Sequence, residues 1–151
     1  MMQNRPENTF NWNIENTNFS INLNTNDIET VFVKILSDYD RSVDIVSFFF
    51  VGDAELLEVN REFLKHDYFT DIITFDYGSF KIVDGEAYIS LDTVDKNSKD
   101  YGVSFENELL RVIFHGILHL CGLNDKTSDE EKVMREAENK YMSEYYGIQK
   151  L

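Results

Sequence analysis

The sequence is poor in the residues that mark secreted, membrane-spanning and nucleic-acid-coating proteins. A single cysteine in 151 residues excludes an intramolecular disulfide and suits a reducing compartment. No apolar run approaches the length of a membrane span, and the first residues, MMQNRPENTF, lack the apolar core of a signal peptide. Basic residues number 14 against 28 acidic ones, a net charge of −14, which speaks against non-specific coating of nucleic acid. We therefore expect a cytoplasmic protein without membrane association.

The one proline, Pro6, and the lack of repeats or low-complexity tracts leave no candidate linker, so we predict a single domain over residues 1–151. Hydrophobic residues make up 42% of the chain, enough for a proper core. Apolar spacing predicts helices around 28–35 and over 53–64, 105–121 and 127–147, and strands over 19–23, 42–51, 72–77 and 87–91. Asp84-Gly85 suits a tight hairpin turn between the last two strands. This mixture predicts an α+β fold, a small mixed β-sheet with helices packed on it.

Local signals support several of these elements. Thr25 or Asn26 is expected to cap the first helix, Ser104 the third, and Thr127 with Glu130 forms a capping box for the last. In the 53–64 helix, we expect Leu56, Leu57 and Phe63 to face inward.

The segment HGILHLCGLND, residues 115–125, carries the strongest functional signal. Histidines at i and i+4 project from one face of a helix, so His115 and His119 are expected to lie together. Gly122 can take a positive φ, end the helix and bring Asp125 over that face. Two histidines, a glycine at i+7 and a third ligand at i+10 reproduce the zincin-like ligand spacing of metzincins, which predicts a metal held by His115, His119 and Asp125.

Two other interpretations of this segment are possible. The histidines can serve as capping or bridging groups in a packed helix, with Asn124 and Asp125 as ordinary turn residues. A zinc peptidase is less favoured, because the residue after the first histidine, the general base of such enzymes, is Gly116. Cys121 points away from His119 on the helix, so we interpret it as a buried core residue.

Three ordered blocks of the chain resemble one family. HGILHLCGLND is similar to the HGxLHLxGYDH signature of the YbeY family, metal-dependent endoribonucleases that mature ribosomal RNA. The stretch from Asn60 to Phe75 resembles its LNxxYRxKDxPTDVLSFP segment, and Gly85–Ser90 resembles its G-[DE]-[IV]-x-I-S strand. The blocks keep the family's order and spacing from about residue 57 to residue 134.

The resemblance implies a metal-dependent single-strand-specific endoribonuclease in ribosomal RNA maturation and ribosome quality control. It places the first two ligands on His115 and His119, and the third, a histidine in the family, on Asp125. Such a set suits one Zn²⁺ per chain and also Mn²⁺ or Fe²⁺, and its catalysis runs through water at the metal. In the family an arginine engages the RNA phosphate, and the matching position of this chain holds Leu64. We therefore expect Arg61 or Lys65 to take the place of that arginine. His66 is either a phosphate contact or a surface residue.

The implied partners are ribosomal RNA and ribosome-associated proteins, and we expect a monomer. The competing hypothesis is a metal-stabilised, ribosome-associated binding protein with little catalysis of its own, which Leu64 and the acidic balance favour.

Overall fold

The computed structural model of the chain describes residues 9–14, 18–64 and 70–150. These residues form, in chain order, β1 (Phe10–Ile14), α1 (Thr25–Asp38), β2 (Ser42–Val51), α2 (Asp53–Leu64), β3 (Ile72–Asp76), β4 (Ile82–Ser90), α3 (Leu91–Tyr101), α4 (Phe105–Leu120) and α5 (Ser128–Gln149). The strands make one sheet in the order β1-β2-β4-β3. β1, β2 and β4 run parallel and β3 is antiparallel to β4, so the predicted mixed sheet is confirmed.

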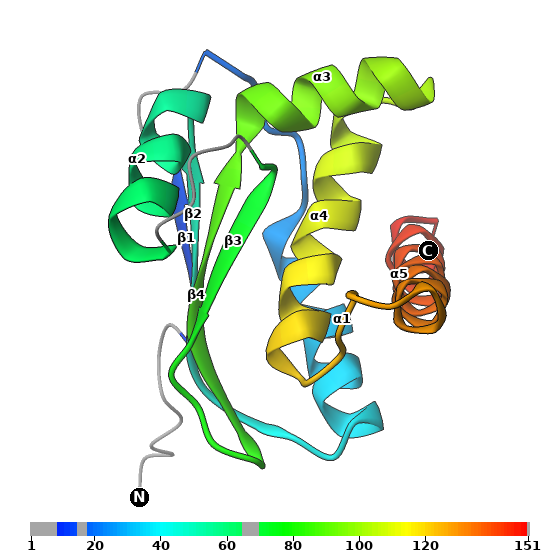
Figure 1. The fold of residues 1–151 in the computed structure, drawn as a ribbon. Helices are drawn as coiled ribbons and strands as arrows, with labels where there is room; N and C mark the ends of the chain where they lie inside the picture. Colours follow the sequence, from blue (N-terminus) through cyan, green and yellow to red (C-terminus); the bar gives the residue numbers. More distant parts are fainter. Residues whose placement is uncertain (1–8, 15–17, 65–69, 151) are drawn as a thin grey trace, which may run out of the picture.

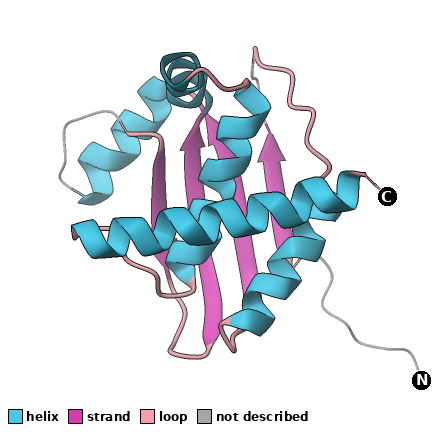
Figure 2. Ribbon diagram, turned by 90° about the vertical axis from the view of Figure 1, so that its right-hand side faces the viewer, coloured by secondary structure: helices cyan, strands magenta, loops and turns pink. Residues whose placement is uncertain are grey.

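Helices cover the sheet unequally. Figure 1 shows α2 on one face and α1, α3, α4 and α5 on the other. α4 packs directly against β3 and β4, while α5 contacts α1 and α4. Figure 2 shows α5 crossing in front of the other helices of this face, as an outer layer. The site residues on α4 therefore lie between a sheet edge and the outermost helix.

The core fills the helix-covered face of the sheet. In β2, Val46, Phe48 and Phe50 alternate with less buried residues and face the helices. The Trp12 ring of β1 stacks on Phe48 with ring centroids 4.8 Å apart, and Phe32 of α1 lies 5.6 Å from Phe48. This aromatic group joins β1, β2 and α1.

Gly116 lets α4 lie close to the sheet. A Cβ atom at this position would lie 2.9 Å from Cδ1 of Ile72 in β3, so the end of the Ile72 side chain would have to shift to make room for it. In the sequence, Gly116 stands out only because it occupies the position of the general base of zinc peptidases. The structure gives it a packing role, which brings the histidines of α4 to the β3 edge.

Most predicted elements are confirmed, but one predicted strand and one predicted turn are wrong. The predicted strand at 19–23 has no regular structure, and the first strand is β1; Phe19 instead stacks on Phe105 of α4, with ring centroids 5.1 Å apart. Asp84-Gly85 lies inside β4, and the chain reverses at residues 77–81. A Cβ at Gly85 would lie 2.3 Å from the Phe75 carbonyl oxygen, so this glycine permits close strand pairing and makes no turn.

Other details also differ from the predictions. The N-cap of α1 is Asn24, whose side chain accepts a hydrogen bond from the Asp27 amide, in place of Thr25 or Asn26. Phe63 is 62% exposed, with its ring edge on Phe75, and does not face inward. Helix α3 was not predicted, because its only buried apolar residues are Leu91 and Val94. The caps at Ser104 and Thr127–Glu130 are confirmed.

None of the helices in the described part of the chain combines the length and the apolar character needed to cross a membrane.

Candidate metal and active site

The two predicted histidines lie one turn apart on the same side of α4. Their imidazole rings are parallel within 3°, with centroids 6.4 Å apart. His119 Nδ1 lies 3.0 Å from the Leu123 carbonyl oxygen, and His115 Nδ1 lies 2.8 Å from Oε2 of Glu138. Both partners can only accept, so each Nδ1 carries a proton that it donates to its partner, and each Nε2 is the nitrogen left for other contacts. Neutral imidazoles held in this way are the form that ligates a metal.

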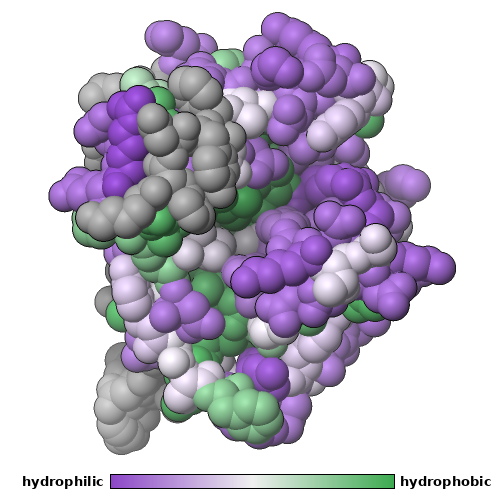
Figure 3. Space-filling model, viewed as in Figure 1, coloured by the Kyte–Doolittle hydropathy of each residue, from purple (hydrophilic) through white to green (hydrophobic). Residues whose placement is uncertain are grey.

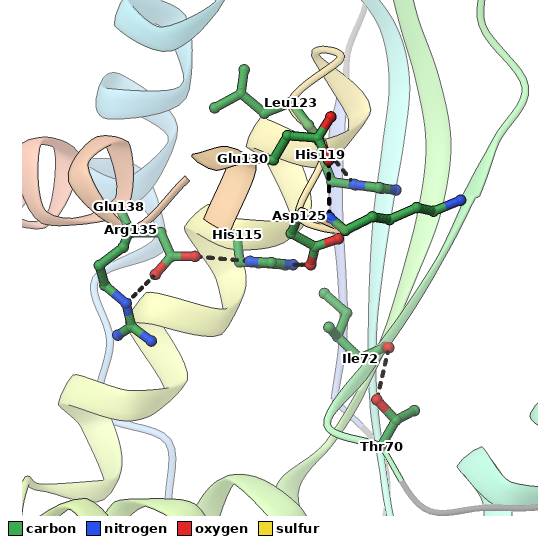
Figure 4. Close-up of polar contacts among 10 residues, drawn as sticks. Thr70, Ile72, His115, His119, Leu123, Asp125, Glu130, Arg135 and Glu138 are labelled. Atoms are coloured by element: carbon green, nitrogen blue, oxygen red, sulfur yellow. Dashed lines mark hydrogen bonds and ion pairs between the residues drawn. The ribbon is translucent and has the colours of Figure 1, made fainter. Parts of the chain in front are cut away.

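Gly122 brings the third predicted ligand to the first. It has φ +108°, and α4 ends just before it with Cys121 as C-cap. Asp125 Oδ2 then lies 3.3 Å from His115 Nε2 (Figure 4). Two ligands of one tetrahedral zinc ion at about 2.0–2.1 Å are themselves separated by roughly 3.3 Å. The His115–Asp125 distance therefore suits two ligands of one ion.

His119 lies further from the pair. No three His, Cys, Asp or Glu side chains among the described residues come together as a preformed metal site. Imidazoles sharing a tetrahedral ion have ring centroids about 5 Å apart, whereas those of His115 and His119 are 6.4 Å apart. The donor types fit a divalent metal, but in this arrangement His119 lies further from His115 than two imidazoles that share one ion.

Charge at His115 favours a cation beside its Nε2. Burial alone would lower the pKa of the imidazole, but Glu138, Asp125 and Asp71 outweigh this effect and raise that pKa. With the proton on Nδ1, the bare Nε2 lone pair faces the Asp125 carboxylate, which is unfavourable unless a positive charge lies there. A proton or a metal ion meets this requirement.

Glu138 of α5 is the support of the site that the sequence did not reveal. Its side chain is buried, and its second oxygen, Oε1, accepts a hydrogen bond from Arg111 Nη1 at 3.1 Å. Arg135 Nε lies 3.9 Å from the same oxygen. The residue is 23 positions after His115, so no local spacing links the two. In contrast, the sequence spacing alone predicts that one face of α4 carries Arg111, His115 and His119, because these residues follow at i, i+4 and i+8.

The three predicted ligands line one polar groove of about 400 Å³, which lies between the β3 edge and helices α4 and α5. Figure 3 shows this hollow, with a predominantly hydrophilic flank on the α5 side. Asp71 and Glu108 also line it. Burial raises the pKa of both carboxyl groups, and the nearby Asp71 charge adds to the rise at Glu108.

Comparison with known proteins identifies the family. The model of the family described as Endoribonuclease YbeY matches residues 13–146. The chain belongs to the YbeY family. An Endoribonuclease YbeY of Bacteroides thetaiotaomicron is 47% identical over 115 residues, which cover 76% of this chain and 84% of that protein. One of Porphyromonas gingivalis is 50% identical over 107 residues, 71% of each chain.

A solved structure shares the fold of this chain. The solution structure of a Thermotoga maritima protein matches with a TM-score of 0.64 and 29% identity, covering 93% of this chain and 91% of that one. The resemblance found in the sequence and the α+β, zincin-like fold class are thereby confirmed.

Leu64 stands where the YbeY family has an arginine, and the structure describes only one of the two basic residues expected to replace that arginine. Arg61 lies on α2, where it pairs with Glu58 at 3.3 Å, and it is not among the described residues that line the groove. Lys65 and His66 lie outside the described residues. The groove is lined instead by Arg111 and Arg135. Cys121 is buried, as predicted.

Proposed function

We propose that this chain is a metal-dependent, single-strand-specific endoribonuclease that acts in ribosomal RNA maturation and ribosome quality control. The observation that carries the proposal is the His115–Asp125 pair, set at ligand spacing inside a polar groove. Membership of the YbeY family supports the same activity, because its members are named endoribonucleases. The proposed ion is Zn²⁺, with Mn²⁺ or Fe²⁺ as alternatives for a two-histidine, one-carboxylate set.

His115, His119 and Asp125 would hold the ion through Nε2, Nε2 and a carboxylate oxygen. When bound there, a divalent cation supplies a Lewis acid for a phosphate oxygen and lowers the pKa of water. Glu138 keeps the His115 proton on Nδ1, so that Nε2 stays directed to the groove. The Leu123 carbonyl does the same for His119.

The size of the groove favours a single strand. A duplex is recognised by its outer shape over a wide surface. The cavity of about 400 Å³ lies within the range of clefts that enclose small ligands, which suits nucleotides of one strand. The proposal includes residues 1–151 acting as one domain, as a monomer in the cytoplasm, with ribosome-associated proteins as partners.

Metal content and RNA cleavage of the purified protein test this function. We expect about one metal ion per chain, and cleavage of a single-stranded ribosomal RNA fragment that stops with chelation and returns with the metal. Asp125→Ala and His115→Ala should lose metal and activity, whereas Asp44→Asn, an exposed carboxylate on β2, should keep both. Metal binding without cleavage would favour the binding-protein hypothesis. Unchanged metal content in Asp125→Ala would remove Asp125 from the site.

A further inference from the structure

The groove contains two guanidinium groups that metal binding does not require, among the four carboxyl groups that also line it. Arg111 and Arg135 both line it, although the chain has twice as many acidic as basic residues. The Arg111 side chain is only 20% exposed and donates to Glu138 at 3.1 Å, so it is held in place. The Arg135 side chain is 60% exposed and lies 3.9 Å from the same carboxylate oxygen, beyond hydrogen-bonding distance. One carboxylate oxygen thus faces two guanidinium groups.

Arg135 directs its terminal nitrogens away from Glu138. In Figure 4 only its Nε faces the carboxylate, and the two terminal nitrogens point to the other side. The parallel N–H groups of a guanidinium are suited to two oxygens of one phosphate. Arg135 therefore presents an unused edge of the kind that binds phosphate.

The acidic residue Glu108 lies deeper in the groove than Arg135. Glu108 is 4% exposed, whereas the Arg135 side chain is 60% exposed, so Arg135 stands further out toward an approaching ligand. The outer cation on this flank is Arg135.

An exposed aromatic ring lines the same groove. Tyr101, the last residue of α3, is 63% exposed. The helix ends there because Gly102 takes φ +70°. Single-strand binding grooves combine exposed aromatic rings, which stack on bases, with cations, which hold phosphates, and this groove is lined by both kinds of side chain.

We propose that Arg135 and Tyr101 form a substrate subsite beside the His115–Asp125 pair, where Arg135 binds a phosphate of single-stranded RNA and Tyr101 stacks on a base. The subsite rests on the proposed nuclease function and adds the contacts that hold the strand. Arg111 is a positioning residue, because its hydrogen bond to Glu138 neutralises the carboxylate that Arg135 would otherwise engage. Arg135 thereby takes the part that the sequence assigned to Arg61 or Lys65.

Binding of the metal-loaded protein to a short 2′-O-methyl RNA, checked to remain intact, tests the phosphate contact. One lost phosphate contact lowers the slope of log K against log salt by about 0.7 for a single strand. We expect this loss in Arg135→Ala, and a preserved slope in Arg135→Lys. Lys132→Ala is the matched control, since Lys132 is an exposed cation on the same helix and does not line the groove. An unchanged slope in Arg135→Ala, or an equal loss in Lys132→Ala, would overturn the assignment.

The stacking contact has its own readout. Tyr101→Ala should weaken binding by roughly 5- to 150-fold without changing the salt slope, and Tyr101→Phe should retain wild-type affinity. Equal affinity of wild type and Tyr101→Ala would remove the base contact. If wild type cleaves RNA while these variants bind normally, only the subsite fails. If wild type neither binds nor cleaves RNA, the proposed function fails and the subsite with it.

Discussion

Replacing Glu138 by glutamine keeps the size of the side chain and removes the charge behind His115. In the wild type, Oε2 accepts from His115 Nδ1 at 2.8 Å and Oε1 accepts from Arg111 at 3.1 Å. Glutamine has one acceptor oxygen, so if it accepts from His115 its amide N–H groups face the Arg111 donor. The variant therefore either loses the imidazole contact or opposes two donors in a buried place.

The expected loss can be estimated from these contacts. Removing a group that orients a metal-ligating histidine typically costs 10- to 100-fold in metal affinity, or about 1.4–2.7 kcal/mol. We expect Glu138→Gln to bind metal more weakly by this factor. The same change also leaves Arg111 poorly paired, so we expect a lower free energy of unfolding even without metal.

Competition with a chromophoric chelator measures the metal affinity. The titration belongs at a pH above the raised pKa of His115, where protons no longer compete for Nε2. Glu136→Gln is the matched control, since it removes the same charge from an exposed position of α5. Circular dichroism shows whether each variant is folded. A folded Glu138→Gln protein with wild-type metal affinity would refute the positioning role of Glu138.

Three further predictions concern the elements around the site. The Tyr141 hydroxyl donates a hydrogen bond to Asp38 at 2.6 Å, which joins α5 to α1 and holds the pKa of Asp38 below its usual range. Tyr141→Phe should lower the free energy of unfolding, measured with denaturant, by about 1.5–3 kcal/mol. Since the folded-state pKa is depressed, this difference should be present at neutral pH and disappear as pH falls through the pKa of folded Asp38. Gly122→Ala should lower the free energy of unfolding by about 1–3 kcal/mol, because Gly122 has φ +108°, which strains an alanine. The same change should weaken metal binding by displacing Asp125. A variant as thermally stable as the wild type would contradict this prediction. Burial raises the pKa of Cys121 to about 11, so the thiol should resist alkylation at neutral pH until the protein unfolds.

Local pattern was enough to predict the helices that carry the ligands. The apolar period of α4, its Ser104 cap and the glycine at 122 all act within a few residues, and they place His115, His119 and Asp125 on one wall of the groove. The YbeY motifs likewise depend on short spacings. These features are local in sequence, so the sequence alone contains them.

Features that depend on distant contacts were missed. β1 forms because Trp12 packs on Phe48, a partner that no local period reveals. Glu138 reaches His115 from the next helix, and Arg135 enters the groove only because α5 packs across α4. Tertiary packing decides each of these, and it also explains Gly85, where a turn signal was in fact a close strand contact.

The 23 positions from His115 to Glu138 also separate the two residues in time during synthesis. At roughly 5–20 residues per second, a ribosome makes the imidazole about 1–5 s before its carboxylate. Until α5 docks, His115 has no Glu138 to fix its tautomer, and the groove lacks Arg135. We therefore expect a nascent chain in which α5 has not yet docked to hold metal weakly and to leave RNA uncut.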